Sequence, residues 1–304
     1  MNKHLFFFIL ILFIYYLLCF DVKIQHFKNI PKKDNLLYIS GWGFSRLCNL
    51  TYCNRYDNDY NNKKIINVKE NDKVFLNLEM FKKFIKFLEK YKPKNKFILI
   101  SHNCDHPFTE KHYKLLEKYV KKVYTINNEC SRDNVITIPI GFRDFPKNTY
   151  EIIKSIKVEK NKNILCYQNY VINTNKIVRT EWYNKFSKKN WIFTIDENQR
   201  KKDNIDEFKF YKHLSSSKYV LSPQGEGIDC HRIYESIYFN SIPILKKGNK
   251  VMDKFYDKLP IIMVDDLNLI TENFLTNNYK KNFSKLKKWK QDNIEWVNPN
   301  FWII

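Results

Sequence analysis

Residues 218–245 read KYVLSPQGEGIDCHRIYESIYFNSIPIL and are the most informative part of the chain. The stretch opens with the apolar run of a buried strand and ends with a second apolar run, Ile242–Leu245. Between them lie a loop with Gly225 and Gly227 and then a segment, 230–239, whose apolar side chains recur at helical spacing. A buried strand, a loop, a helix and another buried strand form one unit of an α/β fold with a parallel sheet.

The same alternation of apolar strands and amphipathic helices runs through most of the chain. It pauses at the charged stretch 145–162 and then starts again. We therefore predict two Rossmann-like α/β domains that face a cleft, at 36–150 and 160–270, followed by a Lys-rich helical tail, 271–304, that packs back across them. The expected strands are 36–40, 97–100, 123–126, 135–140, 163–167, 191–195, 218–221, 242–245 and 261–264, and the expected helices are 78–91, 111–120, 177–187, 208–214 and 230–239.

The glycine loop has the features of a phosphate site. Gly225 and Gly227 are two of only six glycines in the chain, and they let the backbone approach a ligand closely. Asp229 is placed to cap the helix that we expect to begin near Cys230. Free amides and the partial positive charge at a helix N-terminus bind anions, and this corner lies at the carboxyl edge of the sheet, where α/β folds bind ligands.

Arg232 and Glu235 are three residues apart, so both project from one face near the start of that helix. A guanidinium can grip diphosphate oxygens in paired hydrogen bonds, and a carboxylate one turn later can accept the hydroxyls of a ribose. The alternative is an ordinary surface ion pair, which contributes a few tenths of a kcal/mol. The glycine loop favours the binding site. The residues predicted to bind the nucleoside diphosphate are Ser222, Pro223, Gly225, Gly227, Asp229, His231, Arg232, Glu235 and Arg143.

This block resembles the exostosin family, glycosyltransferase family 47. The matching elements are Ser217-Lys218-Tyr219, the Pro-x-Gly loop, Arg232-x-x-Glu235 and Ile242-Pro243-Ile244, while Asn240-Ser241 stands where the family has Gly-Cys. The resemblance covers residues 205–265. It implies a GT-B fold, a UDP-sugar donor, a glycan or protein acceptor, inversion at the sugar carbon and no requirement for a metal.

An inverting transfer needs a base for the acceptor hydroxyl, and Asp or His can serve. The segment 100–107, ISHNCDHP, follows a predicted strand, and we take Asp105 and His106 from it as candidates, with Glu226 of the glycine loop as a third. The alternatives are a polar loop that caps the next helix, or a divalent-cation site formed by His102 with the other two. Arg143 either meets the donor phosphates or pairs with its neighbour Asp144. Trp42, between two glycines, is a candidate for the acceptor side or for the core.

The net charge is +21, with 53 Lys and Arg against 32 Asp and Glu. The excess is spread over the whole chain, whereas nucleic-acid-binding proteins concentrate their cations on one helix or arm. The dispersion argues against a nucleic-acid partner. Other functions consistent with the sequence are a fucosyltransferase-like GT-B enzyme, an inactive nucleotide-sugar-binding protein and a basic nucleic-acid-binding protein.

The N-terminus carries an uninterrupted apolar run, Leu5–Phe20, that ends without the small residues of a cleavage site. We expect a signal-anchor helix at 1–22, a linker at 23–35 and a type II membrane protein of the Golgi or endoplasmic reticulum. Two glycosylation sequons, at Asn49 and Asn282, agree with a lumenal location. No CxxC pair occurs, which argues against a structural zinc site, and Cys48 with Cys53 is the disulfide candidate closest in sequence.

Overall fold

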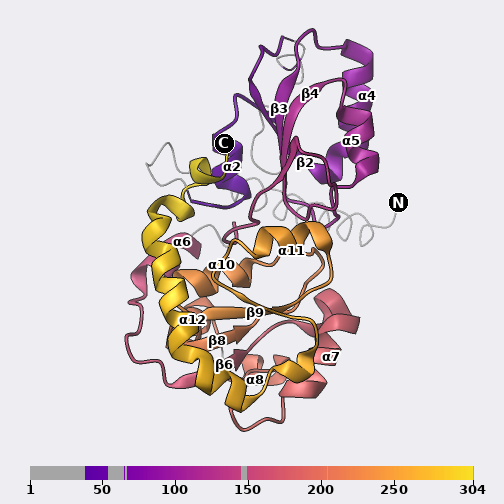
Figure 1. Cartoon of the computed structure of the whole chain (residues 1–304). Coiled ribbons are helices and arrows are strands. Elements are labelled where there is room, and N and C mark those ends of the chain that lie inside the picture. The colour runs from indigo at the N-terminus through magenta and orange to yellow at the C-terminus, as the bar shows by residue number, and fades with distance from the viewer. Residues whose placement is uncertain (1–37, 54–64, 66, 145–148, 204, 304) are drawn as a thin grey trace, which may run out of the picture. The chain divides into compact units, whose positions relative to one another are not determined.

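The computed structural model describes residues 38–53, 65, 67–144, 149–203 and 205–303, all within one compact unit, 37–304. The described residues form two five-stranded sheets in which every neighbouring pair of strands is parallel (Figure 1). The predicted α/β fold with parallel sheets is therefore confirmed.

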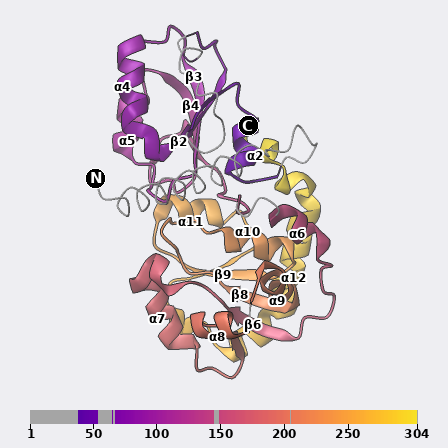
Figure 2. The same cartoon turned by 180° about the vertical axis from the view of Figure 1, so that it is seen from behind.

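The first sheet has the strand order β1-β2-β3-β4-β5. Helices α4 and α5 lie on one side of strands β2 to β4 (Figure 2). Phe84 and Leu88 on the apolar face of α4 are fully buried, and Lys92, the C-cap of this helix, has a left-handed backbone. The elements of this half are α2 (Gly41–Arg46), β1 (Leu50–Tyr52), β2 (Lys73–Asn77), η1 (Leu78–Met80), α4 (Phe81–Tyr91), β3 (Phe97–His102), α5 (Glu110–Leu116), β4 (Val120–Thr125) and β5 (Val135–Thr137). Helix α6 (Thr149–Ser155) follows and contacts α9 (Glu207–Ser216) of the second half.

The second sheet has the strand order β10-β9-β8-β6-β7. Strand β7 is added on one side of β6, and β8, β9 and β10 are added in turn on the other side. Such a switch point opens a crevice at the carboxyl ends of the strands. The elements are β6 (Ile164–Gln168), η2 (Ile172–Asn175), α7 (Lys176–Phe186), β7 (Ile192–Thr194), α8 (Glu197–Lys202), α9 (Glu207–Ser216), β8 (Ser217–Leu221), α10 (His231–Tyr238), β9 (Ile242–Lys246), α11 (Lys250–Tyr256), β10 (Ile262–Val264), η3 (Leu267–Leu269), α12 (Glu272–Asp292), η4 (Ile294–Val297) and η5 (Pro299–Trp302).

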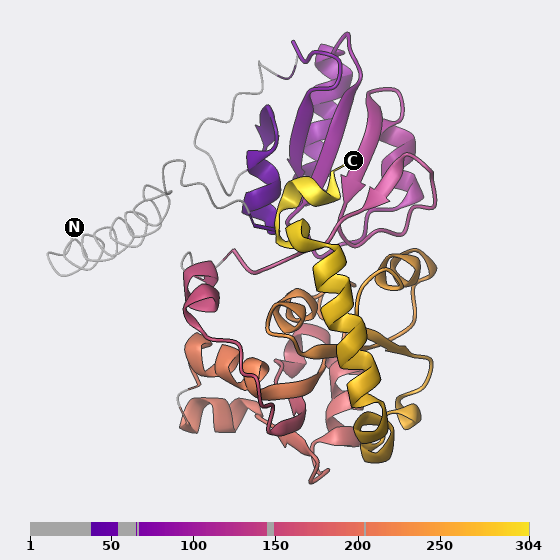
Figure 3. The same cartoon turned by 60° about the vertical axis from the view of Figure 1, so that its left-hand side comes forward.

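The C-terminal segment links the two halves. Helix α12 packs on the second half, and the chain then continues to η5 beside α2 (Figure 3). The backbone amide of Ile39 donates to the carbonyl of Val297 at 2.8 Å, and Trp296 is buried in a core cluster that draws on both sheets. The predicted helical tail thus contacts both halves, whereas the exact domain boundaries stay a prediction.

Several local predictions differ from the structure. Instead of a strand over 36–40, the described part of that segment leads into helix α2, which Ser40 caps by accepting a hydrogen bond from the amide of Gly43 at 3.0 Å. The short strands β1 and β2 were not predicted, and helix α6 forms inside the stretch 145–162 because Tyr150 and Ile153 find buried positions there. The suggested disulfide between Cys48 and Cys53 is also not formed.

The expected membrane anchor, 5–22, lies outside the described residues. Within the part of the chain that the structure describes, none of the helices has the length and apolar character needed to span a membrane.

Lys162, the last residue of the charged stretch, is buried and caps two helices. Its Nζ donates to the carbonyls of Ser215 at 2.6 Å and Phe239 at 2.9 Å, and to Ser241 Oγ at 3.1 Å. These carbonyls stand at the C-terminal ends of α9 and α10, where a positive charge is favoured. Burial, and next the charge of Lys290, lowers the pKa of Lys162 to about 7.

We expect Lys162→Met to lower the free energy of unfolding at pH 7 by about 1–3 kcal/mol, because three buried acceptors lose their donor. Between the folded pKa of about 7 and the ordinary lysine value of 10.5, the unfolded chain binds the extra proton. Wild-type stability therefore rises with pH in this window, and the gap to Lys162→Met should widen. Urea denaturation at pH 7 and pH 9 measures both effects; equal stability at pH 7 would mean that burial of the charge cancels the three bonds.

Candidate active site

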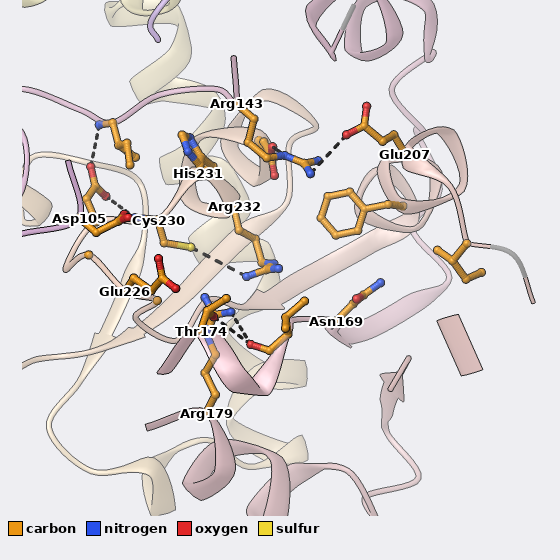
Figure 4. A pocket seen from close by; sticks show the side chains of 18 of the residues that line it. Asp105, Arg143, Asn169, Thr174, Arg179, Glu207, Glu226, Cys230, His231 and Arg232 are labelled. Carbon is orange, nitrogen blue, oxygen red and sulfur yellow. Dashed lines mark hydrogen bonds and ion pairs between the residues drawn. The ribbon is translucent and has the colours of Figure 1, made fainter. Parts of the chain in front are cut away.

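A cavity of about 380 Å³ opens at the carboxyl ends of strands from both sheets (Figure 4). Asp105 reaches it from the loop after β3, and Arg143 from the segment after β5. From the second half come Asn169 after β6, the glycine loop after β8 and the first turns of α10. The glycine loop and the start of α10 thus form part of a cavity wall.

Arg232, the second residue of α10, lines this cavity, and none of the described carboxylates forms an ion pair with its guanidinium. Its carbon Cζ lies 5.9 Å from the ring centroids of both Tyr170 and Phe210, and Nη1 is 3.9 Å from Cys230 Sγ. Its Nε is buried, and no described residue accepts a hydrogen bond from it. A buried donor without an acceptor is costly, so the side chain is arranged for a partner that the described residues do not supply.

Arg179 on α7 lies next to Arg232 and was not predicted from the sequence. Its Nε donates to the carbonyl of Gln224 at 3.1 Å, and Nη1 donates to the carbonyl of Val171 at 2.8 Å. A Cβ on Gly225 would lie 2.9 Å from Arg179 Nη2, so the glycine lets this guanidinium lie close to the loop. Burial, and after it the positive charge of Arg232, lowers the pKa of Arg179 to about 10. Two guanidinium groups therefore face one cavity and repel each other.

One compositional signal points to Arg179. The chain has 53 basic residues, of which seven are arginines, and three of these seven line the cavity. In a chain that uses lysine for its surface charge, arginine marks positions that need a planar, bidentate donor.

Glu235 on α10 is buried, and its Oε1 accepts from Arg143 Nε at 3.0 Å and from Tyr211 OH at 2.9 Å. Arg143 also donates to Tyr211 OH at 2.7 Å and pairs with Glu207 at 3.4 Å. Burial opposes the charge on Arg143, but Glu235 and then its other partners outweigh it and raise the pKa of Arg143. Both bonds to Glu235 use Oε1, which leaves Oε2 to a ligand in the cavity.

The partner of Arg143 differs from the one proposed from sequence. The suggested pair with Asp144 is wrong: the Asp144 carboxylate instead accepts a hydrogen bond from the backbone amide of Trp42 at 3.2 Å, and Trp42 lies in helix α2. Arg143 uses its guanidinium to hold Glu235 and Glu207, so its contact with donor phosphates stays a prediction without support from its bonding.

Asp229 has a structural role. The residue at the cap of α10 is Cys230, one position later than predicted. The buried Asp229 carboxylate accepts from Tyr234 OH at 2.6 Å, Tyr256 OH at 3.0 Å, the amide of Ile140 at 2.8 Å and the amide of Cys230 at 2.9 Å. Burial raises the pKa of Asp229 despite these four donors. The carboxylate ties the start of α10 to the segment that follows β5.

At Gly227 the glycine loop lies against Asn127, which belongs to the first half. A Cβ there would lie 2.6 Å from Asn127 Nδ2. Asn127, which has a left-handed backbone, accepts a hydrogen bond from the amide of Asp229 at 2.7 Å and donates to the carbonyl of Cys104 at 3.0 Å. One side chain thus joins the loops after β3, β4 and β8, and only glycine leaves room for it.

His231, the first residue of α10, also lines the cavity. Its Nδ1 lies 2.7 Å from the carbonyl oxygen of Gly141. A carbonyl oxygen can only accept, so Nδ1 carries the hydrogen of this bond.

Most of the residues predicted from sequence meet at this cavity. Those that line it are Asp105, Arg143, Gly225, Glu226, Gly227, Asp229, His231, Arg232 and Glu235. Three do not: His106 is exposed outside the lining, while Ser222 and Pro223 are buried below it, and Ser222 lines a second cavity of about 340 Å³.

The suggested cation site is not formed in the described part of the chain, where no three His, Cys, Asp or Glu side chains gather as metal ligands. His102 is buried beside Phe44, whereas Asp105 and His106 are exposed. Burial lowers the pKa of His102 to about 4, so this imidazole is neutral at physiological pH.

The chain shows similarity to solved structures and to one protein family. Two solved structures with similar folds are the GtfA/B complex, at 10% identity and a TM-score of 0.40, and alpha,alpha-trehalose 6-phosphate synthase from Burkholderia multivorans, at 9% and 0.40. The alignments cover 78% and 76% of this chain, and 56% and 72% of those chains, so it spans little more than half the length of the first. No curated protein sequence matches significantly.

A family model matches more than half of the chain. Residues 142–298 match the RXYLT1 C-terminal domain, an exostosin-like family, and this segment contains the glycine loop, both cavity arginines of the second half and Glu235. The resemblance of residues 205–265 to the exostosin family is therefore confirmed. The chain belongs to the family of the RXYLT1 C-terminal domain.

Proposed function

We propose that the cavity binds the nucleoside diphosphate of a UDP-sugar, and that the enzyme transfers the sugar with inversion to a hydroxyl of a glycan or protein. The observation that carries the proposal is the pair Arg179 and Arg232. Their guanidinium groups share one cavity, repel each other, and include a buried Nε that lacks an acceptor among the described residues. A diphosphate brings about two negative charges and several acceptors to such a pair.

The same pair supports transfer without a metal. As the sugar leaves, negative charge builds up on the diphosphate, and a fixed positive group must meet it. Arg232 and Arg179 stand at that position, one at the N-terminal turn of α10 and one held by two carbonyls. Together they supply the charge that a divalent cation supplies in other transferases.

Glu235 suits the ribose. Its carboxylate lines the cavity three residues after Arg232, and the bonds from Arg143 and Tyr211 fix its orientation. A carboxylate held by one oxygen can accept a ribose hydroxyl with the other. The proposed donor thus lies along the first turns of α10, with diphosphate at Arg232 and ribose at Glu235.

The acceptor side of the proposal rests on two exposed carboxylates, Asp105 and Glu226, which line the same cavity from the two halves of the molecule. Their negative charge suits hydroxyl groups, which donate hydrogen bonds to carboxylates. The apolar run Leu5–Phe20 supports an anchored enzyme of the secretory pathway, as expected for an exostosin-like family.

A thermal-shift screen with UDP-, GDP- and CMP-sugars tests the donor. A ligand at about 100 times its dissociation constant stabilises the folded state by about 2.7 kcal/mol, which is a shift of several degrees in Tm. We expect UDP-sugars to give this shift, and the shift and turnover to persist in EDTA. A shift with GDP-sugars alone would favour a fucosyltransferase-like enzyme, and a shift that needs a divalent cation would contradict transfer without a metal.

A further inference from the structure

We propose that His231 is the base that removes the proton from the acceptor hydroxyl, a role that rests on the transferase function proposed above. The sequence had suggested Asp105, His106 or Glu226 for this step. His231 differs from them in that the protein fixes both its ring orientation and the position of its proton.

The carbonyl of Gly141 fixes the orientation of the His231 ring. Gly141 has φ +70°, and a Cβ on it would lie 2.1 Å from the carbonyl oxygen of Ile39. The next residue, Phe142, donates its amide to the same oxygen of Ile39 at 2.8 Å. The backbone at Gly141 is therefore locked on both sides, and its own carbonyl is held 2.7 Å from His231 Nδ1.

This bond determines which nitrogen of the ring can act as a base. Nδ1 must carry a hydrogen in order to donate to a carbonyl. In the neutral ring the lone pair then resides on Nε2, the second nitrogen of this cavity-lining side chain. An orienting partner on one nitrogen and a free lone pair on the other is the arrangement of histidine bases in enzymes.

The charged groups around His231 suit the same role. Arg232 and Arg143 line the cavity with it, as do the carboxylates of Asp105 and Glu226, and the neighbouring His102 is a neutral imidazole. His231 also stands at the N-terminus of α10, next to Arg232. The carboxylates stabilise the imidazolium once the proton has moved to it.

The competing groups are less suited to proton transfer. Asp105 is exposed, and no hydrogen bond from the described residues fixes its carboxylate. Glu226 is exposed and interacts with Arg179, on the diphosphate side. His106 lies outside the lining of the cavity. Asp105 and Glu226 remain suited to orienting acceptor hydroxyls.

The step balances as follows. The acceptor O–H bond breaks, and its proton goes to His231 Nε2. The acceptor oxygen forms the new bond to the anomeric carbon of the sugar, and the bond from that carbon to the phosphate oxygen breaks. Its electron pair leaves on the nucleoside diphosphate, where Arg232 and Arg179 meet the charge.

The test is His231→Asn. The amide nitrogen of asparagine takes the place of Nδ1 and keeps the bond to Gly141, but the variant has nothing in place of Nε2. The probes are UDP for affinity, and release of UDP from a UDP-sugar with water as the acceptor, which needs no identified acceptor. We expect kcat to fall by about 10²–10⁴-fold, UDP affinity to change by less than about 3-fold and Tm to stay unchanged.

The pH dependence separates a base from a ligand. In the wild type, activity should fall on the acid side as the imidazole gains a proton, and this limb should disappear in His231→Asn. Loss of UDP affinity with kcat retained would make His231 a phosphate ligand and overturn the proposal. Loss of the acid limb in Asp105→Asn or Glu226→Gln, with the limb retained in His231→Asn, would assign the base to that carboxylate.

The variant His231→Gln covers the case in which the asparagine variant folds poorly. It carries an amide near the position of Nε2 but no basic nitrogen, so the proposal predicts the same loss of kcat. Recovery of activity by glutamine would show that a hydrogen bond suffices and would contradict a base. A wild type that binds no UDP at all would instead refute the proposed function, which is a distinct outcome.

Discussion

Arg232→Ala should weaken the binding of UDP and UDP-sugars by at least about 100-fold, which corresponds to about 2.7 kcal/mol. A guanidinium that grips a diphosphate makes charge-assisted bonds worth about 1.5–3 kcal/mol each, and the variant removes them. Calorimetric titration with UDP measures the loss. The same loss should appear with UDP-sugar, since both carry the diphosphate.

The stability of ligand-free Arg232→Ala distinguishes a binding role of Arg232 from a structural one. In the wild type, Arg232 repels Arg179 and buries an Nε that lacks an acceptor among the described residues. Its removal should therefore leave Tm unchanged or slightly higher. A residue that stabilised the fold would give the opposite result, with lower Tm and unchanged affinity, and that outcome would show the site to be structural.

Arg132→Ala is the matched control. Arg132 forms an exposed ion pair with Glu110 at 2.9 Å, outside the lining of the cavity. Surface pairs of this kind contribute about 0–1 kcal/mol, so both Tm and UDP affinity should stay close to wild type. A comparable loss of affinity in this control would mean that the general positive charge, and not the position of Arg232, binds the nucleotide.

Gly141→Ala should lower the free energy of unfolding by about 2–5 kcal/mol. The left-handed backbone at φ +70° costs an L-residue about 1–2 kcal/mol, and crowding of a packed site adds about 1–3 kcal/mol. The crowding is severe because the new Cβ would meet the backbone of Ile39 at 2.1 Å and 2.5 Å. These are main-chain atoms, which cannot move aside as a flexible side chain would. Urea denaturation measures the loss.

Gly248→Ala provides the comparison. A Cβ on Gly248 would have no heavy atom within 4 Å, and its φ is not in the left-handed region. Its substitution should be neutral or stabilise by about 0.4–1 kcal/mol through the unfolded chain. Equal stability of the two variants would contradict the locked backbone at Gly141, and with it the fixed carbonyl that orients His231.

The core of the site could be predicted because its signals are local. A strand, a glycine loop and a helix follow one another within residues 218–239, and their apolar periodicity sets the face on which Arg232 and Glu235 project. Gly225 and Gly227 were identified from their scarcity, and the structure gives the reason for each: Arg179 and Asn127 occupy the space of a side chain.

The parts that were missed depend on distant contacts. Arg179 lies on α7, and nothing in its own helix marks it, because its partners are carbonyls of Gln224 and Val171 in two loops. The partners of Glu235 come from residues 143 and 211, which local periodicity cannot bring together. Strand β1 has three residues, too few for a periodic pattern, and it exists because β2 pairs with it.

The most direct test of the donor site is a crystal structure of the protein with UDP. The account predicts that the diphosphate lies between Arg179 and Arg232, that Arg232 Nε donates to a phosphate oxygen, and that a ribose hydroxyl reaches Glu235. UDP bound instead in the second cavity, the one lined by Ser222, or a diphosphate away from both arginines, would contradict it.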